Sequence, residues 1–429
     1  MQMETNIEDI MGIEMKFCQC CEGLLLAAAL FLSTTPVAAQ NIFKTAMSQM
    51  TFSKKDFADT IKVKVFDGAV IVPVEIEGQE RHFMFDTGAQ SGAWYSPKED
   101  WMKPLSDDSV MVADINKKVH KQILYKSSPI KLGNLVIGNY PLVQGEGMVP
   151  YSCSVFDGAF GFDLVGKGLS FKLDTKDSLL IVTDKKGFFA EEEKNRPFVK
   201  YKLINKTKPV VQVQSPIGKI AAVFDTGAIR VWLDLPQRTF DKWLARYPKK
   251  REDIVALTVQ KDSTVNTNIG LHGVSNDTIE ERVLHFPSVK IGSLPVNDLY
   301  ISTACHSLGI GTALLMHTSM IIDAQKKRFV FLPHDPQTEL SVGNEEIRSL
   351  KFLPAEVGDS LGVLKAIVRK GSTAYQQGIR TGDYLIEVNG IPIKDPCTYM
   401  QMEGKNKETP MILRSPDGTE KQVTVKRTY

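Results

Sequence analysis

This 429-residue chain has a small net charge, few histidines and few cysteines. The formal charge is only +2, which gives little electrostatic attraction for nucleic acid, and no zinc-finger or RNA-binding motif is present. The seven histidines show no HExxH or other ligand spacing, so we predict no metal and no cofactor. A GxxxxGK string at 161–167 is followed by Gly168 instead of the Ser or Thr that binds magnesium, which argues against a phosphate-binding loop.

Long apolar runs are also absent, except for a short one near the N-terminus. The apolar stretch Leu24–Leu32 is preceded by Lys16 and followed by Val37 and Ala39, small residues at the positions that precede a cleavage site. A membrane-spanning helix needs about 20 apolar residues, so this order predicts a secretory signal peptide over residues 1–39, with Met15 as an alternative start. We expect an exported protein, periplasmic or extracellular and of Gram-negative type, without a membrane span after cleavage.

Cleavage at that point would leave three cysteines, Cys153, Cys305 and Cys397, which allow at most one internal disulfide. Cys153 and Cys305 lie eight and six residues before Gly161 and Gly311, which are equivalent positions of the repeat described next. A disulfide between them is one alternative, and a buried free thiol at Cys305 is the other. In both cases the fold must depend on its apolar core.

An internal repeat is what the sequence does contain. The pentapeptide FDTGA occurs twice, with its aspartates at Asp86 and Asp225. Further features recur in the same order around both copies. The segment IKLGNLVIGNYPLV (130–143) matches VKIGSLPVNDLYIS (289–302), and each copy ends with two strands that are separated by an aspartate, Asp174 in the first copy and Asp323 in the second. We therefore predict two homologous β-rich lobes, over residues 57–183 (lobe 1) and 197–334 (lobe 2), joined by a charged connector.

A third region follows a polar, turn-rich linker that begins after Pro333. Its sequence alternates strands with turns, and Ser372 or Thr373 can cap a short helix that Gly378 ends. Asn389-Gly390 and Asp417-Gly418 are typical of tight turns. The pattern predicts a separate domain over residues 348–429.

The repeated pentapeptide suits acid–base chemistry. Two copies of one unit usually pack about a pseudo-two-fold axis, so Asp86 and Asp225 would face each other there and share one proton. The charged carboxylate then takes a proton from water while the protonated one donates to a carbonyl oxygen, which hydrolyses an amide. The neighbouring residues support this arrangement by cross-axis hydrogen bonds (Thr87, Thr226), close backbone approach (Gly88, Gly227) and small size (Ala89, Ala228).

These two DTGA sites resemble the active-site loops of the pepsin and retropepsin superfamily of aspartic proteases, and the resemblance covers residues 57–334. It implies a mostly β, two-lobed acid-protease fold with catalytic Asp86 and Asp225, polypeptide substrates and a monomeric protease unit. Gly161 and Gly311 match the glycines that underlie each loop in that family. A β-hairpin flap is also implied, for which the candidates are Gly270, Leu271, His272 and Gly273 in lobe 2 and Tyr125 in the hairpin of lobe 1.

The segment KGSTAYQQGIRTGDYLIEVNG (370–390) resembles the core of a bacterial PDZ domain. The resemblance implies a small β-sandwich over 348–429 that captures extended peptides or C-termini by strand addition. Ser360, Leu361, Gly362 and Val363 would form its carboxylate-binding loop, just before an edge strand, and a helix over 397–402 would line the groove. Docking on the lobes, or assembly, is the alternative role of this domain.

Two classes of function therefore remain. One is an exported aspartic endopeptidase with a PDZ accessory domain. The other is a non-catalytic peptide-binding scaffold that retains the protease fold. A third alternative, which the sequence supports less, is a periplasmic chaperone-like adaptor driven by the PDZ domain. Both DTGA copies are intact, which favours the enzyme.

Overall fold

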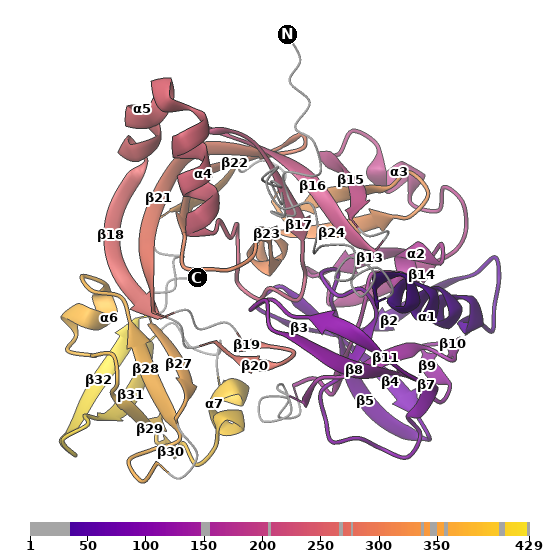
Figure 1. The fold of residues 1–429 in the computed structure, drawn as a ribbon, viewed down its shortest axis with the longest axis horizontal. Helices are drawn as coiled ribbons and strands as arrows, with labels where there is room; N and C mark the ends of the chain where they lie inside the picture. The colour runs from indigo at the N-terminus through magenta and orange to yellow at the C-terminus, as the bar shows by residue number, and fades with distance from the viewer. Residues whose placement is uncertain are drawn as a thin grey trace, which may run out of the picture.

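The computed structural model describes residues 35–146, 155–204, 207–265, 269–275, 278–335, 339–343, 350–355, 359–402 and 408–426. The described chain is mostly β, as the sequence predicts, and its strands form three large sheets and one two-stranded hairpin (Figure 1).

The first sheet belongs to lobe 1 and has 11 strands. Its order is β1 (Thr51–Phe52), β10 (Leu135–Gly138), β9 (Ile130–Leu132), β4 (Ala69–Ile76), β5 (Gln79–Phe85), β12 (Gly158–Phe160), β6 (Gly92–Trp94), β11 (Pro141–Gln144), β8 (Val119–Lys126) and β7 (Lys103–Ala113), with β3 (Lys64–Phe66) beside β4. The central strand β4 is rich in β-branched residues and is largely buried, which suits a strand covered on both faces.

The second sheet has 13 strands and contains strands from both lobes. Its order is β2 (Ala58–Lys62), β14 (Leu179–Thr183), β13 (Ser170–Asp174), β24 (Thr318–Asp323), β25 (Arg328–Pro333), β15 (Phe198–Ile204), β16 (Lys208–Ser215), β21 (Thr278–Ile291), β22 (Leu294–Ser302) and β26 (Leu340–Gly343), with β17 (Gly218–Phe224), β18 (Thr258–Val265) and β23 (Gly309–Ile310) attached. Strands β13 and β24 pair antiparallel, with Leu173 opposite Met320. The strand–Asp–strand ends of the two repeats therefore join the lobes.

The third sheet lies in the C-terminal region, in the order β27 (Leu350–Pro354), β28 (Leu364–Val368), β29 (Tyr384–Val388), β31 (Glu408–Arg414) and β32 (Glu420–Lys426), with β30 (Ile391–Pro392) beside β29. The expected loop Ser360–Val363 leads into β28, which pairs with β27 on one side and with β29 on the other. The prediction of an edge strand after this loop is therefore wrong, because the backbone groups of β28 already have strand partners. The edge strand is β27.

The helices are short and lie around the sheets (Figure 1). They are α1 (Thr35–Gln49), α2 (Asp163–Gly166), α3 (Ala190–Glu193), α4 (Gln237–Arg246), α5 (Arg251–Ala256), α6 (Thr373–Gln376) and α7 (Pro396–Met402), with 3₁₀ turns η3 (Pro248–Lys250) and η4 (Thr312–Met316). As predicted, Ser372 caps α6 by accepting a hydrogen bond from the Tyr375 amide. Within the described part of the chain, no helix has the length and apolar character needed to cross a membrane.

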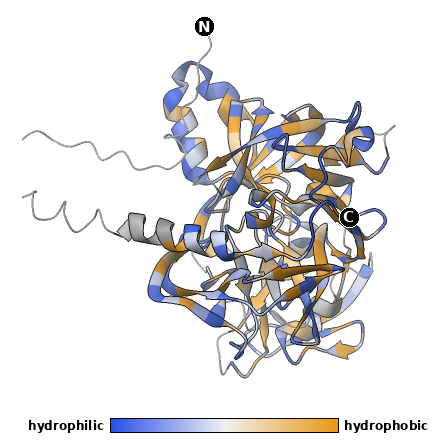
Figure 2. Ribbon diagram, turned by 90° about the vertical axis from the view of Figure 1, so that its right-hand side faces the viewer, coloured by the Kyte–Doolittle hydropathy of each residue, from blue (hydrophilic) through white to orange (hydrophobic). Residues whose placement is uncertain are grey.

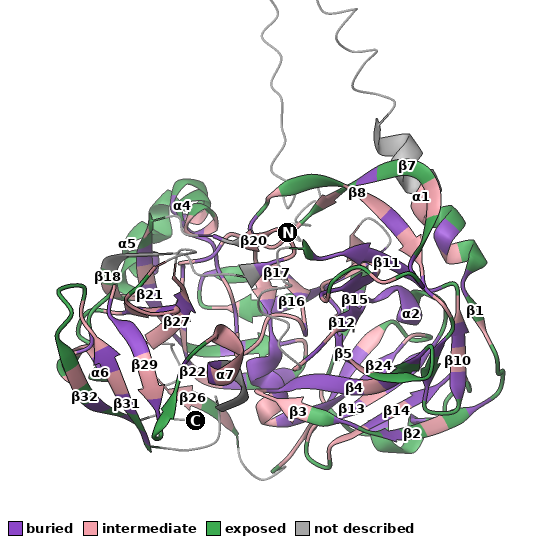
Figure 3. Cartoon of the chain, turned by 90° about the horizontal axis from the view of Figure 1, so that it is seen from below, coloured by how far each residue is buried: buried purple, intermediate pink, exposed green. Residues whose placement is uncertain are grey.

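One apolar core extends through both lobes, and a second core fills the C-terminal domain. Hydrophobic residues follow the strands in Figure 2, and Figure 3 shows the same strands as largely buried. The division into cores agrees with a C-terminal region that packs on its own. The predicted linker is only partly a linker, because β26 lies inside it and pairs parallel with β22 of lobe 2.

A buried ion pair attaches the C-terminal domain to lobe 2. Glu281 in β21 contacts Arg369 at 2.6 Å, and their side chains are 4% and 13% exposed. The Ser302 hydroxyl also donates a hydrogen bond to Glu281, and the Gln260 side chain donates one to the Lys370 carbonyl (3.1 Å). These residues lie on the β18–β21–β22 part of lobe 2, so the domain is attached to the long hairpin of that lobe.

Of the two alternatives for Cys305, a disulfide with Cys153 or a buried free thiol, the structure has the free thiol. Cys305 is a buried free thiol, so the Cys153–Cys305 disulfide is wrong. Cys397 is disulfide-bonded, and its partner lies outside the described residues, as does Cys153. Most of the predicted signal peptide also lies outside them; residues 35–39, just before the predicted cleavage point, begin helix α1.

Candidate active site

Each FDTGA segment lies at the end of a buried strand. Strand β5 ends at Phe85 and strand β17 at Phe224, and both phenylalanines are fully or almost fully buried. The apolar strand thus fixes the start of each loop, and the aspartate is the first residue beyond it. Asp86 donates its amide to the Phe160 carbonyl of β12, and Asp225 donates to Ile310 of β23, each at 2.8 Å.

The two threonines join the loops by reciprocal hydrogen bonds. The Thr87 hydroxyl donates to the Phe224 carbonyl (2.6 Å) and accepts from the Thr226 amide (3.0 Å). The Thr226 hydroxyl donates to the Phe85 carbonyl and accepts from the Thr87 amide (3.0 Å). Both threonines are buried, so these bonds lock the two loops to each other across the lobes.

The carboxyl groups of Asp86 and Asp225 meet between the loops and are hydrogen-bonded to each other. Each carboxyl lies against the glycine of the opposite loop, where any side chain would collide with it; a Cβ at Gly227 would lie 2.6 Å from the Asp86 Cγ. Asp86 Oδ1 accepts hydrogen bonds from the amides of Gly88 (2.8 Å) and Ala89 (3.0 Å), and Asp225 Oδ1 accepts one from Gly227 (2.9 Å). The glycines are needed at these positions because their backbone touches the carboxyls.

Burial, the Asp225 charge and the hydrogen bond that Asp86 shares with Asp225 raise the pKa of Asp86 well above its ordinary value, whereas the amides of Gly88 and Ala89 lower it. Two adjacent buried carboxyls cannot both ionise at low cost, so the pair holds one proton near neutral pH.

The two predicted supporting glycines lie directly beneath the loops. A Cβ at Gly161 would lie 2.7 Å from the backbone of Ser91, and one at Gly311 would collide with the Ala228 carbonyl. The Phe162 amide donates to the Ala89 carbonyl (3.0 Å), and the Thr312 amide donates to Ala228 (2.9 Å). Both loops therefore rest on a backbone layer with no room for a side chain.

Three residues near the dyad have no signal in the sequence. Tyr95 is buried, and burial together with the charges of Asp86 and Asp225 raises its pKa, which places it close to both carboxyls. Arg230 follows the second loop in the left-handed region (φ 62°) and pairs with Asp67 of lobe 1 through its Nε, at 2.6 Å. Their partners are distant in sequence, so periodicity and motif spacing could not find them.

The candidate flap of lobe 2 forms a hairpin tip that contacts lobe 1. Strands β19 (Ile269–Gly270) and β20 (Gly273–Val274) bracket Leu271 and His272, and lie between the C-terminal domain and lobe 1 in Figure 1. The His272 amide donates to Asp114 (3.1 Å), and its ring stacks on His120 with 4.1 Å between centroids. Leu271 packs against the apolar cluster that contains Tyr95.

Tyr125 is not part of that contact. It lies near the end of β8, opposite Pro104 and Leu142, whereas the hairpin turn of lobe 1 lies between β7 and β8 at residues 114–118. The prediction of Tyr125 as a flap residue is therefore wrong, because its register places it at the base of the hairpin. Asp114 and His120 occupy the positions that meet the lobe 2 tip.

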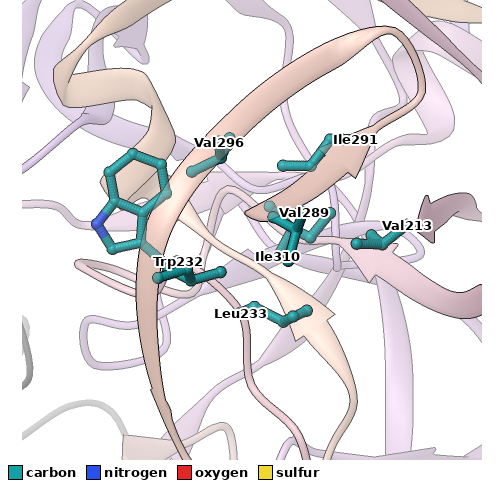
Figure 4. A pocket seen from close by; sticks show the side chains of 8 residues that line it. Val213, Trp232, Leu233, Val289, Ile291, Val296 and Ile310 are labelled. Carbon is teal, nitrogen blue, oxygen red and sulfur yellow. The ribbon is translucent and has the colours of Figure 1, made fainter. Parts of the chain in front are cut away.

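Lobe 2 contains an apolar gap beneath its loop. Its lining is Val213, Trp232, Leu233, Val289, Ile291, Val296, Leu299 and Ile310, and the space between them is too narrow for a water molecule (Figure 4). The gap has no polar function and belongs to the core. In the described part of the chain, His, Cys, Asp and Glu side chains do not gather in threes at a spacing that could hold a metal ion.

Comparisons with known proteins give no family for this chain. No protein-family model matches it, and neither does any curated protein. Among solved structures, the Basic 7S globulin from soybean aligns with 9% identity and a TM-score of 0.36 over 64% of this chain and 94% of that one. A likeness this weak gives no indication of the function of this chain.

Proposed function

We propose that the protein is an aspartic endopeptidase that hydrolyses peptide bonds with Asp86 and Asp225. The observation that carries the proposal is the hydrogen-bonded pair of carboxyls between two FDTGA loops. The crossed threonine bonds support it, because they hold the two groups at a fixed separation. In this proposal the two repeats form a pepsin- or retropepsin-like fold.

The proposed chemistry needs only water and the two carboxyls. Ionised Asp225 takes a proton from a water molecule as the water oxygen attacks the carbonyl carbon of the peptide bond. Protonated Asp86 donates to the carbonyl oxygen, which gives a neutral tetrahedral intermediate. Asp225 then gives its proton to the amide nitrogen, Asp86 takes a proton from a hydroxyl of the intermediate, and the C–N bond breaks, which restores both carboxyls. The raised pKa of Asp86 supports its role as the initial acid.

The decisive experiment compares the wild type with Asp86→Asn, Asp225→Asn and the double variant on an unfolded polypeptide, from acid to neutral pH. Either single change should lower cleavage by about a thousandfold or more, and the double change should be little worse, since residues that act as a unit are not additive. Asp108→Asn is the matched control, because Asp108 is an exposed residue of β7. Equal cleavage by all variants would contradict the proposal.

A peptide-binding scaffold is the competing proposal. It predicts that the wild type binds unfolded polypeptide without cleaving it at any pH, and that both Asp→Asn variants bind equally well. Mass spectrometry of the incubated polypeptide, together with a binding isotherm, separates the two proposals in one set of samples.

For the C-terminal domain, we propose a PDZ-like role in which an extended peptide adds to β27. Among the described residues β27 pairs only with β28, so its other edge is open to a strand. Helix α7 lies beside it, since the rings of Phe352 and Tyr399 are in edge contact at 5.2 Å. Titration of the full chain with a C-terminal peptide library tests the role, and Phe352→Ala should weaken any binding that uses this groove.

We also propose export, with the mature chain beginning near Gln40. The support is the order of basic, apolar and small residues in the leader. Residues Ile42, Phe43 and Ala46 of α1 pack on lobe 1 and would remain after such a cleavage. N-terminal sequencing of exported material tests this, and an uncleaved product in the cytoplasm would contradict it.

A further inference from the structure

A polar pair lies buried beneath the Asp86 loop. Tyr140 is completely buried just before β11, and Asp163, the first residue of α2, is 3% exposed. The Tyr140 hydroxyl donates to Asp163 Oδ1 (3.0 Å) and accepts a hydrogen bond from the Gly161 amide (2.9 Å). The hydroxyl therefore connects a buried carboxyl to the glycine under the active-site loop.

The backbone beside Gly161 contacts the Asp86 loop on both sides. Phe160 accepts the Asp86 amide (2.8 Å), and Phe162 donates to the Ala89 carbonyl (3.0 Å). Gly161 lies between these two contacts, and its own amide points to Tyr140. A displacement of Gly161 would thus move the residues that hold the catalytic carboxyl in place.

Asp163 acts in this network as a neutral acid. Its Oδ2 is buried and has no hydrogen-bond partner among the described residues, whereas Oδ1 accepts from Tyr140 and from the Leu164 amide (2.9 Å). An ionised carboxylate with one bare oxygen would be costly there. Burial accordingly raises the pKa of Asp163 to about 8, so it holds a proton at neutral and acid pH.

Lobe 2 has no such pair at the equivalent positions. The repeat alignment places Leu299 opposite Tyr140, and the residue two after Gly311 is Ala313, where lobe 1 has Asp163. Leu299 lines the apolar gap, which is too narrow for a water molecule. The layer below the second loop is therefore apolar at these two positions, and the buried polar pair belongs to lobe 1.

We propose that Tyr140 and Asp163 are positioning residues that hold the Asp86 loop in its catalytic geometry through the Gly161 amide. The inference deepens the proposed protease function and rests on it. Neither residue touches the dyad directly. Their effect should appear in the chemical step, because a small misplacement of a reacting group costs rate while substrate binding remains.

The test measures kcat and KM on a quenched peptide for Tyr140→Phe, Asp163→Leu and Asp163→Asn. Tyr140→Phe and Asp163→Leu should each lower kcat by about a hundredfold with KM within about twofold. Asp163→Asn keeps the neutral acceptor for the Tyr140 hydroxyl and should retain kcat within about threefold. Tyr247→Phe in lobe 2, at a tyrosine that is 37% exposed, is the matched control and should leave kcat unchanged.

A second measurement does not depend on cleavage. Hydrogen exchange of the segment over residues 84–90 should become at least about tenfold faster in Tyr140→Phe, because its supporting hydrogen bond is lost, while the equivalent segment 223–229 keeps its rate. If wild type cleaves nothing, the protease proposal fails, and this exchange result alone decides the positioning role.

Two results would overturn the inference. One is Tyr140→Phe with wild-type kcat and wild-type exchange over 84–90. The other is Asp163→Asn as impaired in kcat as Asp163→Leu, since the neutral acid would then not be the form that supports the loop. Asp163→Asn preserves the size of the side chain, so it remains informative if Tyr140→Phe fails to fold.

Discussion

Lobe 1 and lobe 2 present the same pentapeptide to each other, but the layers beneath the two loops differ. In lobe 1, β12 pairs with both β5 and β6, and Tyr140 and Asp163 form a buried polar pair below it. In lobe 2, β23 pairs with β17 alone among the named strands, and Leu299 faces an apolar gap. The contacts that are shared by both loops are the ones that the symmetric dyad requires.

The comparison shows which parts of a duplicated unit are constrained. The threonine bonds are reciprocal, so a change in one lobe removes partners in the other. The supporting layers differ in their contacts. The Gly161 amide is held by the Tyr140–Asp163 pair of its own lobe, whereas Thr312, beside Gly311, donates a hydrogen bond to the Asp67 carbonyl of lobe 1 (2.6 Å).

The largest effect is expected where the lobes are alike. Thr87→Val leaves the Phe224 carbonyl and the Thr226 amide buried without partners, and Thr226→Val does the same to lobe 1. Each change should lower the free energy of unfolding by about 4 kcal/mol, at about 1–3 kcal/mol for each unsatisfied group. Denaturant titration measures both losses.

The control for this pair is Thr60→Val, because Thr60 is exposed on β2. It should change stability by less than about 0.5 kcal/mol. Clearly unequal losses for Thr87→Val and Thr226→Val would show that the two loops are not equivalent even in the layer they share.

The next effect concerns the apolar layer of lobe 2. Leu299→Ala enlarges a gap that is already free of water and should cost about 3 kcal/mol, from lost transfer energy and the cavity left behind. Calorimetry of the full chain measures the loss, and Val259→Ala, at a residue that is 53% exposed, is the control. A loss below about 1 kcal/mol would mean that this layer collapses easily and is not a rigid support.

A smaller and pH-dependent effect is expected in lobe 1. Asp163 has a pKa of about 8 when folded and an ordinary, lower one when unfolded, so it stabilises the fold at acid pH and loses that contribution as pH rises towards 8. Asn does not titrate. The unfolding free energy of Asp163→Asn relative to wild type should therefore rise by about 1.4 kcal/mol per pH unit between pH 5 and 7.

Because other titrating groups are common to both proteins, they cancel in that difference. Denaturant titrations at several pH values measure it. A difference that stays constant with pH would show that Asp163 is ionised in the folded protein.

The smallest effect is expected at the surface of the repeat. Lys131 and Lys290 occupy equivalent positions, and Lys131 pairs with Glu75 at 3.2 Å while both side chains are about half exposed. Lys131→Met and Lys290→Met should each change stability by less than about 1 kcal/mol. A larger loss for Lys131→Met, measured at low and high salt, would identify a further difference between the lobes.

Local patterns predicted much of this fold. The strands before each FDTGA segment, the strand–Asp–strand ends and the cap at Ser372 all depend on neighbouring residues, which a sequence displays directly. The meeting of Asp86 and Asp225 followed from duplication, since a repeated unit supplies its own partner. The interleaving of both lobes in one sheet, and β26 within the linker, depend on long-range pairing that no local pattern encodes.

The wrong predictions, for Tyr125 and for the edge strand after Ser360–Val363, also result from strand pairing that no local pattern encodes. Tyr125 was an aromatic residue in the right hairpin, but the register of β7 and β8 places it away from the turn. The loop Ser360–Val363 has a suitable composition, but a strand upstream of it occupies the edge. The Tyr140–Asp163 pair and Tyr95 depend on residues brought together only by the folded chain.

The ion pair between Glu281 and Arg369 has a consequence for how this protein can be divided. A chain shortened before the C-terminal domain would lose the cation and uncover Glu281, which would then be solvated beside the Ser302 hydroxyl. The cost of about 3–5 kcal/mol for an unpaired buried charge would arise in the full chain, where Arg369→Met leaves Glu281 covered. The domain boundary in the sequence is thus not a neutral cutting site, because truncation exposes a charged residue of β21 that the full chain keeps buried.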